Sequence, residues 1–250
     1  MIKLSERLKM IADNIEPGSG VADIGTDHGY LPIYLCQTKK YGKVIATDVN
    51  TGPLQKAKAN FILTVPDMKP DLRLGDGLDP LKPGEVETVV IAGMGGYLIS
   101  DILTWDLGKT LTYKRFILQP RNNSGKLRRD LYKLGFRILR EDIAFEQNRF
   151  CEIITCEPPK EVQRACEPAE SGFRPSEVSF DYPDLLIKGS LRNVRSYLES
   201  QLRTENGIMA KIGEGTGGAG TEDNPDYQKR VRRAARIRKL LAELDAGGKR

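Results

Sequence analysis

Val-Ala-Asp-Ile-Gly-Thr-Asp-His-Gly, at residues 21–29, is a short apolar strand that runs into a turn with two glycines. A helical segment over residues 30–38 follows, and a strand, a glycine-bearing turn and a helix in that order open the nucleotide pocket of Rossmann-type sheets. A turn that binds pyrophosphate exposes backbone amides through glycines spaced G-x-G-x-x-G. This turn carries Asp23 and Asp27 instead, and because carboxylates repel phosphate, the stretch favours a ligand with positive charge.

S-adenosylmethionine (SAM) is the common adenosine cofactor with positive charge, which it carries on a sulfonium and an α-ammonium group. The first turn is therefore predicted to bind the methionine part of SAM, through Asp23, Gly25, Thr26, Asp27, His28 and Gly29. The glycines allow close approach of the backbone. Asp27 stands where the usual methyltransferase motif has its middle glycine, and a tight turn without a ligand is the alternative interpretation.

Residues that follow the second and third predicted strands complete the candidate cofactor site: Asp48, Val49, Asn50, Asp76 and Gly77. Asp48 can accept hydrogen bonds from both ribose hydroxyls, or it can cap the next helix. Asp76 can accept from the adenine amine, whereas in isolation Asp-Gly is an ordinary turn. Because the carboxyl ends of parallel strands share one sheet edge, these acids are expected to meet at the ligand crevice.

Seven apolar, β-branched runs are candidate strands, at residues 21–25, 43–48, 72–74, 88–93, 115–119, 136–139 and 150–155. Helical segments alternate with them, at 30–38, 53–63, 96–105 and 126–134. This alternation predicts a doubly wound, mostly parallel sheet. The last two runs are joined by a connection too short for a crossover helix, which predicts an antiparallel hairpin at the sheet edge. Together they predict an α/β, Rossmann-like fold of the class I methyltransferase type.

The chain is expected to divide into a SAM-binding domain, residues 1–160, and a helical extension, residues 161–250. In the extension we expect a polar linker up to residue 179, a helix over 186–212, a glycine-rich loop over 213–224 and a helix that starts at Asn224-Pro225. The two helices predict an antiparallel, coiled-coil-like hairpin. Seven basic residues and no acid lie between residues 229 and 239, a cluster that binds a polyanion or forms a solvated face.

The strand at 88–93 ends in Ala92 and Gly93, and Met94, Gly95 and Gly96 follow it. Methyltransferases that act on the N6 amine of adenine usually carry an acid or amide, Pro-Pro and an aromatic residue here, so this stretch disfavours N6 chemistry. Its glycines open space for a flat ring, or serve close packing of helix on strand. We predict that Gly93, Met94 and Gly95, with His28 and Tyr30, frame the substrate, that Ala92 and Gly93 also contact the cofactor, and that no residue is an obligate base.

The four cysteines, Cys36, Cys151, Cys156 and Cys166, lack metal-ligand spacing, and the chain has one histidine. We therefore expect no metal site, and reduced thiols in a cytoplasmic protein. The N-terminal stretch lacks the apolar region of a signal peptide, and no run is long enough for a membrane span.

Four stretches together resemble the bacterial tRNA (adenine-22-N1)-methyltransferases: residues 3–8 (Lys-Leu-Ser-Glu-Arg-Leu), 22–32 (Ala-Asp-Ile-Gly-Thr-Asp-His-Gly-Tyr-Leu-Pro), 91–96 (Ile-Ala-Gly-Met-Gly-Gly) and 118–120 (Leu-Gln-Pro). The resemblance covers residues 1 to about 160. It implies a cytoplasmic enzyme that moves a methyl group from SAM to N1 of adenine 22 in tRNA. Adenine N1 already has a lone pair, which agrees with the absence of an obligate general-base side chain from the prediction. An adenine that is base-paired must first be exposed.

Basic side chains on the sheet domain and in the 229–239 cluster are then predicted to bind tRNA phosphates: Arg7, Arg121, Arg128, Arg129, Lys229, Arg230, Arg232, Arg233 and Arg236. A monomer is favoured. The alternatives are a methyltransferase for another RNA, a non-catalytic RNA-binding protein with a SAM fold, and an NAD-dependent oxidoreductase, which Asp27 disfavours.

Overall fold

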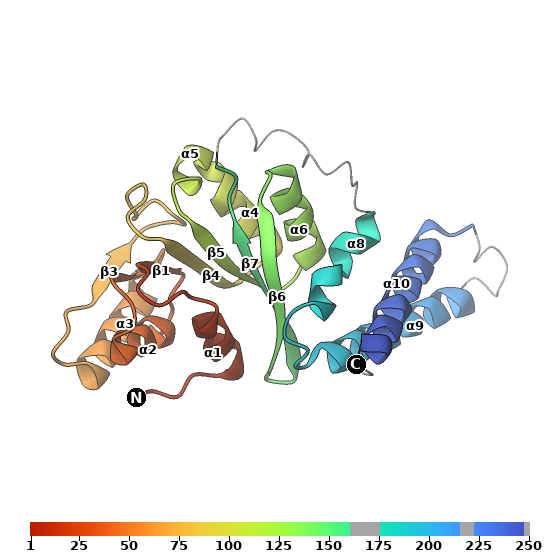
Figure 1. Cartoon of the computed structure of the whole chain (residues 1–250), viewed down its shortest axis with the longest axis horizontal. Helices are drawn as coiled ribbons and strands as arrows, with labels where there is room; N and C mark the ends of the chain where they lie inside the picture. The colour runs from red at the N-terminus through yellow and green to blue at the C-terminus, as the bar shows by residue number, and fades with distance from the viewer. Residues whose placement is uncertain (161–175, 216–222, 248–250) are drawn as a thin grey trace.

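Seven strands form one sheet in the order β3-β2-β1-β4-β5-β7-β6 in the computed structural model, which describes residues 1–160, 176–215 and 223–247 (Figure 1). The strands are β1 (Val21–Ile24), β2 (Val44–Asp48), β3 (Asp71–Leu74), β4 (Thr88–Met94), β5 (Arg115–Pro120), β6 (Arg137–Glu146) and β7 (Arg149–Glu157). The first five pair in parallel, and β7 runs antiparallel to both β5 and β6. The predicted sheet and its terminal hairpin are confirmed, with the reversed strand next to the edge strand β6.

Helices cover both faces of this sheet: α1 (Glu6–Asp13), α2 (Tyr30–Thr38), α3 (Thr51–Thr64), α4 (Gly96–Trp105), α5 (Leu107–Thr110) and α6 (Ser124–Lys133). Alternate residues of β4 point into different apolar layers. Val89 and Ile91 pack in one layer with residues of α4 and α6. Val90 packs in the other with residues of α1 and α2. Strands buried on both faces explain the continuous apolar runs of the sequence.

The extension contains α8 (Glu177–Asp181), a 3-10 helix η1 (Asp184–Ile187), α9 (Val194–Gly215) and α10 (Pro225–Gly247). Figure 1 shows α9 and α10 side by side, and an ion pair of 2.5 Å from Arg195 to Asp245 joins the start of α9 to the end of α10. The two helices are therefore antiparallel, as predicted. Their apolar residues pack on Ile143 of β6 together with Tyr182 and Leu186, so the hairpin is bound to the edge of the sheet.

Three predicted boundaries in the extension change. The helix expected over residues 186–212 begins at Val194, because Asn193 has a φ of +62° and residues 184–187 form η1. The expected linker is wrong at residues 177–179, which belong to α8, while residues 161–175 lie outside the described part of the chain. Residues 213–215 of the expected loop end α9, and 216–222 also lie outside it.

The start of α10 is as predicted. Asn224 accepts hydrogen bonds from the backbone N–H groups of Asp226 and Tyr227, at 2.9 and 3.1 Å, which is the bonding of an N-cap. In the described residues, none of the helices combines the length and the apolar character that a membrane crossing requires.

Candidate cofactor and substrate site

A cavity of about 690 Å³ opens where β1, β4 and β5 end. Predicted site residues that line it are Arg7, Asp23, Gly25, Thr26, Asp27, His28, Tyr30, Ala92, Gly93 and Arg121. Three other segments complete its wall: the N-terminal stretch, the end of β5 and the tip of the β6–β7 hairpin. The carboxyl edge of the sheet thus holds the cavity that its strand order predicts.

The first turn is bound to β2 through its backbone. The N–H groups of Gly25 and Thr26 both donate to the carbonyl of Thr47, each at 2.9 Å. Gly25 has a φ of +74°, a backbone conformation that favours glycine, and a Cβ there would also displace the end of the Met94 side chain, whose Cε would lie 2.4 Å away. Gly29 instead packs against Ala57, which a Cβ would approach to 3.0 Å, and it does not line the cavity.

Asp23 is 7% exposed, and its environment favours the neutral acid. Burial raises its pKa to about 6, against smaller opposing effects of a Thr26 hydrogen bond and the Arg7 charge, and the Asp48 charge raises it further. A buried acid with a raised pKa gains from a nearby positive charge. These carboxyl groups therefore fit a cationic ligand such as SAM better than a phosphate.

Asp48 is 8% exposed and ties the second strand end to the first turn. One carboxylate oxygen accepts from the N–H of Asn50 at 2.8 Å, and the other accepts from the N–H of Asp27 at 3.4 Å. The residue before α3 is Asn50, so the alternative in which Asp48 caps that helix is wrong. Val49 and Asn50 are exposed beside it. The predicted contact with ribose stays a prediction.

Asp76 and Gly77 do not line the large cavity. They line a second hollow of about 160 Å³ together with Leu98, Ile102 and Trp105 of α4. The contact of Asp76 and Gly77 with adenine stays a prediction, and it would be made at this smaller hollow.

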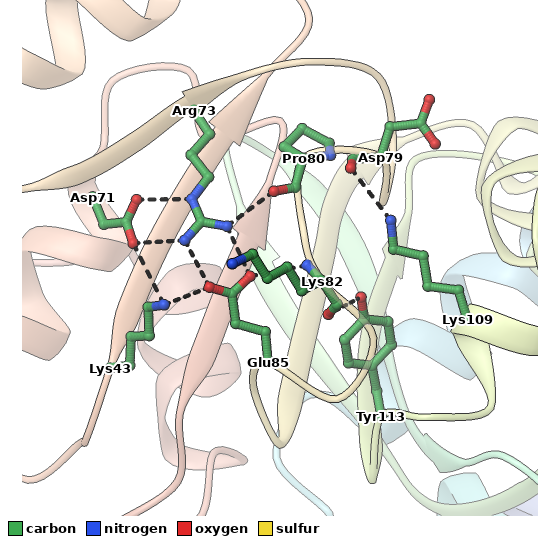
Figure 2. A network of polar contacts seen from close by, with 9 residues as sticks. All are labelled: Lys43, Asp71, Arg73, Asp79, Pro80, Lys82, Glu85, Lys109 and Tyr113. Atoms are coloured by element: carbon green, nitrogen blue, oxygen red, sulfur yellow. Dashed lines mark hydrogen bonds and ion pairs between the residues drawn. The ribbon is translucent and has the colours of Figure 1, made fainter.

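A charge network holds the loop that follows Asp76 and Gly77 against β3 (Figure 2). The Arg73 guanidinium donates to both oxygens of Glu85 at 2.8 Å and to the carbonyl of Pro80 at 2.9 Å. Lys43 pairs with Glu85 at 2.5 Å. The hydrogen bond of Arg73 lowers the pKa of Glu85 well below its usual value, and that of Lys43 adds to the effect, although burial opposes both. Ion pairs and hydrogen bonds of Arg73 and Lys43 therefore hold the loop that carries Asp76 and Gly77.

His28 and Tyr30 form an aromatic pair at the mouth of the cavity. Their ring planes are 4° apart with centroids 5.5 Å apart, and His28 Nδ1 lies 2.8 Å from an Asp27 oxygen. Tyr30 is 49% exposed. Both residues line the cavity, and their role in framing the substrate stays a prediction.

The glycines after β4 have different surroundings. A Cβ on Gly93 would meet no heavy atom within 4 Å, so this position is open. A Cβ on Gly96 would lie 2.7 Å from the carbonyl oxygen of Asn123, so Gly96 serves close packing. Met94 and Gly95 do not line the cavity, and their predicted role in framing the substrate gains no support from their positions.

Sequence reasoning missed part of the wall. The missed residues include Lys3, Ser5, Gln119, Glu146, Arg149, Phe150 and Cys151. Glu146 binds Arg7 at 2.7 Å; burial raises its pKa, but hydrogen bonds from Ser5 and Arg7 bring it below the usual value. Only the stretches 3–8 and 118–120, quoted above for a resemblance, gave a signal for part of this set.

The predicted phosphate-binding residues divide into exposed and internally paired side chains. Arg128 is 1% exposed and bonds Glu141 and Glu152 and the carbonyl of Phe180, so its prediction as an RNA contact is wrong. The cause is its direction, because it lies on the face of α6 that packs on β6, β7 and α8.

The basic cluster of α10 is also partly neutralised within the chain. Arg230 and Arg233 contact Glu205, and Arg233 and Arg236 pair with Asp181 and Asp184, each of these two at 2.7–2.8 Å. Arg129 similarly lies 3.3 Å from Glu177. Lys229 and Arg232 are exposed. The cluster therefore joins α10 to α9 and binds the hairpin to α8 and η1, and a smaller part of it is exposed to a polyanion.

Comparisons with known proteins agree with this geometry. Residues 4–154 match the family described as a methyltransferase domain. The tRNA (adenine(22)-N(1))-methyltransferase of Bacillus subtilis is 37% identical over 156 residues, which span 62% of this chain and 66% of that protein, just under two thirds of its length.

Solved structures extend the similarity to the C-terminal helices. The B. subtilis M1A22 tRNA methyltransferase TrmK has a TM-score of 0.77 and 28% identity, over 96% of this chain and 100% of that chain. Streptococcus pneumoniae Sp1610 in complex with S-adenosyl-L-methionine has a TM-score of 0.76 and 28% identity, over the same shares of the two chains.

Proposed function

Because the chain belongs to the methyltransferase-domain family and, within it, to the bacterial tRNA (adenine-22-N1)-methyltransferases, we propose that it transfers a methyl group from SAM to N1 of adenine 22 in tRNA. The observation that carries the proposal is the composition of one cavity. Buried Asp23, open Gly93 and the stacked rings of His28 and Tyr30 all line it. A site for a cationic cofactor and a space for a flat base thus adjoin.

Asp23, Gly25 and Ala92 would hold the methionine part of SAM in the large cavity, and Asp48 would hold its ribose. Asp76 and Gly77 would hold the adenine at the smaller hollow. SAM supplies a methyl group on a sulfonium, which a neutral nucleophile can attack. In this arrangement the acids surround the cofactor, and the open glycine, Gly93, lies beside the cofactor. The cofactor and the target adenine would therefore bind to different residues.

The chain's own task is to position the target adenine. The N1 lone pair needs no proton removal, so alignment of N1 with the methyl group at about 3–3.5 Å supplies most of the acceleration. The N1 atom lies on the Watson–Crick edge, so the base must leave its pair and enter the cavity. His28 and Tyr30 offer a face on which the exposed ring can stack.

Three cations at the cavity rim are suited to the RNA backbone. Lys3, Arg121 and Arg149 line the cavity, their side chains are exposed, and none is in an ion pair with a described residue. They come from the N-terminal stretch, the position directly after β5 and the start of β7. Phosphate contacts fix the register of a strand, so cations around the mouth would direct the target nucleotide inward. A tRNA substrate implies that the enzyme works in the cytoplasm, and we propose that it does so as a monomer.

Incubation of the enzyme with methyl-labelled SAM and a tRNA transcript, followed by nucleoside analysis, tests the reaction. We expect N1-methyladenosine at position 22 and none in a transcript with guanine there. Label at another position would favour a different RNA site. Binding of tRNA without label transfer would favour the non-catalytic alternative.

Calorimetry tests the cofactor assignment separately. Asp48→Ala should weaken SAM binding, because it removes the carboxylate that would accept from the ribose and that accepts from the N–H of Asp27. Asp67→Ala is the matched control, since Asp67 is exposed after α3 and away from the cavity. Unchanged SAM affinity in Asp48→Ala would show that the assignment of the ribose site is wrong.

A further inference from the structure

Gly93 interrupts the ladder between β4 and β5. Ala92 pairs with Gln119 and Met94 pairs with Pro120, so Gly93 has no partner residue on β5. Its φ is +78°, and its Cβ side is open. A residue left out of a ladder in this way re-aims the backbone next to a site. The peptide at Gly93 therefore needs another group to fix its orientation.

The side chain of Gln119 provides that group. Its amide oxygen accepts from the backbone N–H of Gly93 at 3.1 Å and from Nη1 of Arg7 at 3.2 Å, and its amide nitrogen donates to the carbonyl of Pro120 at 3.0 Å. Because Gly93 N–H and Arg7 are both donors, they also dictate which amide atom faces them. Gln119 is 2% exposed and lines the cavity. All its polar atoms are thus used by partners within the site.

The contacts continue across the cavity wall. Arg7 of α1 also binds Glu146 at the end of β6, at 2.7 Å between Nε and Oε2. Gly93, Gln119, Arg7 and Glu146 therefore form one continuous chain of contacts from β4 to β6. A buried polar chain in which every member is satisfied fixes its members in one arrangement.

We propose that Gln119 is a positioning residue for methyl transfer, which orients the Gly93 peptide and Arg7 around the target adenine. The inference rests on the proposed function, because it takes the base beside Gly93 to be adenine 22 of the tRNA. Gln119 acts through the backbone of Gly93 and the side chain of Arg7, and it transfers no proton. Its oxygen is the essential atom, because it is the acceptor for both neighbours.

Two substitutions at one position separate this role from simple packing. Gln119→Met keeps the length of the side chain and removes the acceptor, so kcat should fall, by up to about 100-fold if the base is misplaced by an ångström. Gln119→Glu keeps an acceptor for both Gly93 and Arg7. It loses the donation to Pro120 and adds a negative charge, which the Arg7 guanidinium can pair with, so it should retain most of kcat. In both variants SAM affinity and the tRNA KM should stay within about threefold of wild type.

Gln55→Met is the matched control, because Gln55 is exposed on α3 and lines neither of the two hollows described above. It should leave kcat unchanged. Full kcat in Gln119→Met, or equal loss of kcat in Gln119→Met and Gln119→Glu, would overturn the proposal. A fall in kcat that only follows the folded, SAM-binding fraction would overturn it as well, because that result describes packing.

Amide hydrogen exchange tests the contact without any substrate. The N–H of Gly93 should be protected in wild type and in Gln119→Glu, and exchange faster in Gln119→Met. Protection that is equal in all three proteins would contradict the positioning role. Failure of the proposed function is distinct, since wild type would then form no N1-methyladenosine while the exchange pattern stayed as expected.

Discussion

The pH dependence contributed by Asp23 is the most direct consequence of its burial. Its pKa is about 6 in the folded protein, against an ordinary value of 3.8, so the folded state binds the proton more tightly than the unfolded chain. Stability from this group is therefore present at low pH and is lost as pH rises from about 4 through 6. The ionised form at pH 7 costs about 3 kcal/mol, from about two pKa units at 1.36 kcal/mol each.

A cationic cofactor reverses the preference, because it binds best to the ionised carboxylate. With a pKa of about 6, about one molecule in ten is ionised at pH 5, so the apparent Kd for SAM should rise about tenfold between pH 7 and pH 5. Asp23→Asn has no such titration, and its weaker SAM affinity should not change over this range. The folded Asp23→Asn protein without SAM should be more stable than wild type at pH 7, by up to about 3 kcal/mol.

Urea unfolding and calorimetry between pH 4.5 and 7.5 measure both effects. The difference in unfolding free energy between Asp23→Asn and wild type should widen as pH rises and level off above pH 7. The same SAM profile in a His28→Gln variant separates the carboxylate from the single histidine. A pH-independent difference in stability, or a SAM affinity that does not fall in acid, would refute the reasoning.

Three further predictions concern the frame around the cavity. Arg128→Met leaves Glu141, which is 1% exposed, without its partner, so we expect a loss of about 3–5 kcal/mol in urea unfolding; an unchanged midpoint would contradict it. Arg73→Ala removes the donors that hold Glu85 in Figure 2, and should cost about 2 kcal/mol by thermal unfolding, whereas a neutral result would mean that the loop needs no support. Gly96→Ala places a Cβ 2.7 Å from the Asn123 oxygen and should cost about 1–3 kcal/mol, which a wild-type melting temperature would disprove.

The fold was predictable because its signals are local. Two helices have the predicted bounds, α2 and α4, and each begins directly after a glycine. The acids at the ends of β1 and β2 were predictable for the same reason, since strand ends at one edge follow from the parallel order alone. Gly29 shows the limit of this reasoning, because its positive φ and its contact with Ala57 give a packing role to a glycine that was assigned to the cofactor.

The rest of the site depends on contacts between distant segments. Nothing in the sequence around Arg7 indicates that α1 docks where Glu146 ends β6, 139 residues further along the chain. Nor does the run of cations around Arg128 indicate that one of them turns toward Glu141. Helix periodicity predicts that a face is buried, and it does not predict which acids the buried face will meet.

Basic side chains of α10 form ion pairs that attach the hairpin to α8 and η1, a role that the composition of the helix does not indicate. Arg233 and Arg236 bind Asp181 and Asp184, which precede α9, so the hairpin is fixed to the same α8 segment whose Phe180 carbonyl accepts from Arg128. Arg128 in turn bonds strands β6 and β7, whose hairpin tip forms one wall of the cavity. An RNA that contacts exposed residues of α10 would therefore bind to a hairpin that these contacts connect, through α8, β6 and β7, to the cavity wall that carries Arg149.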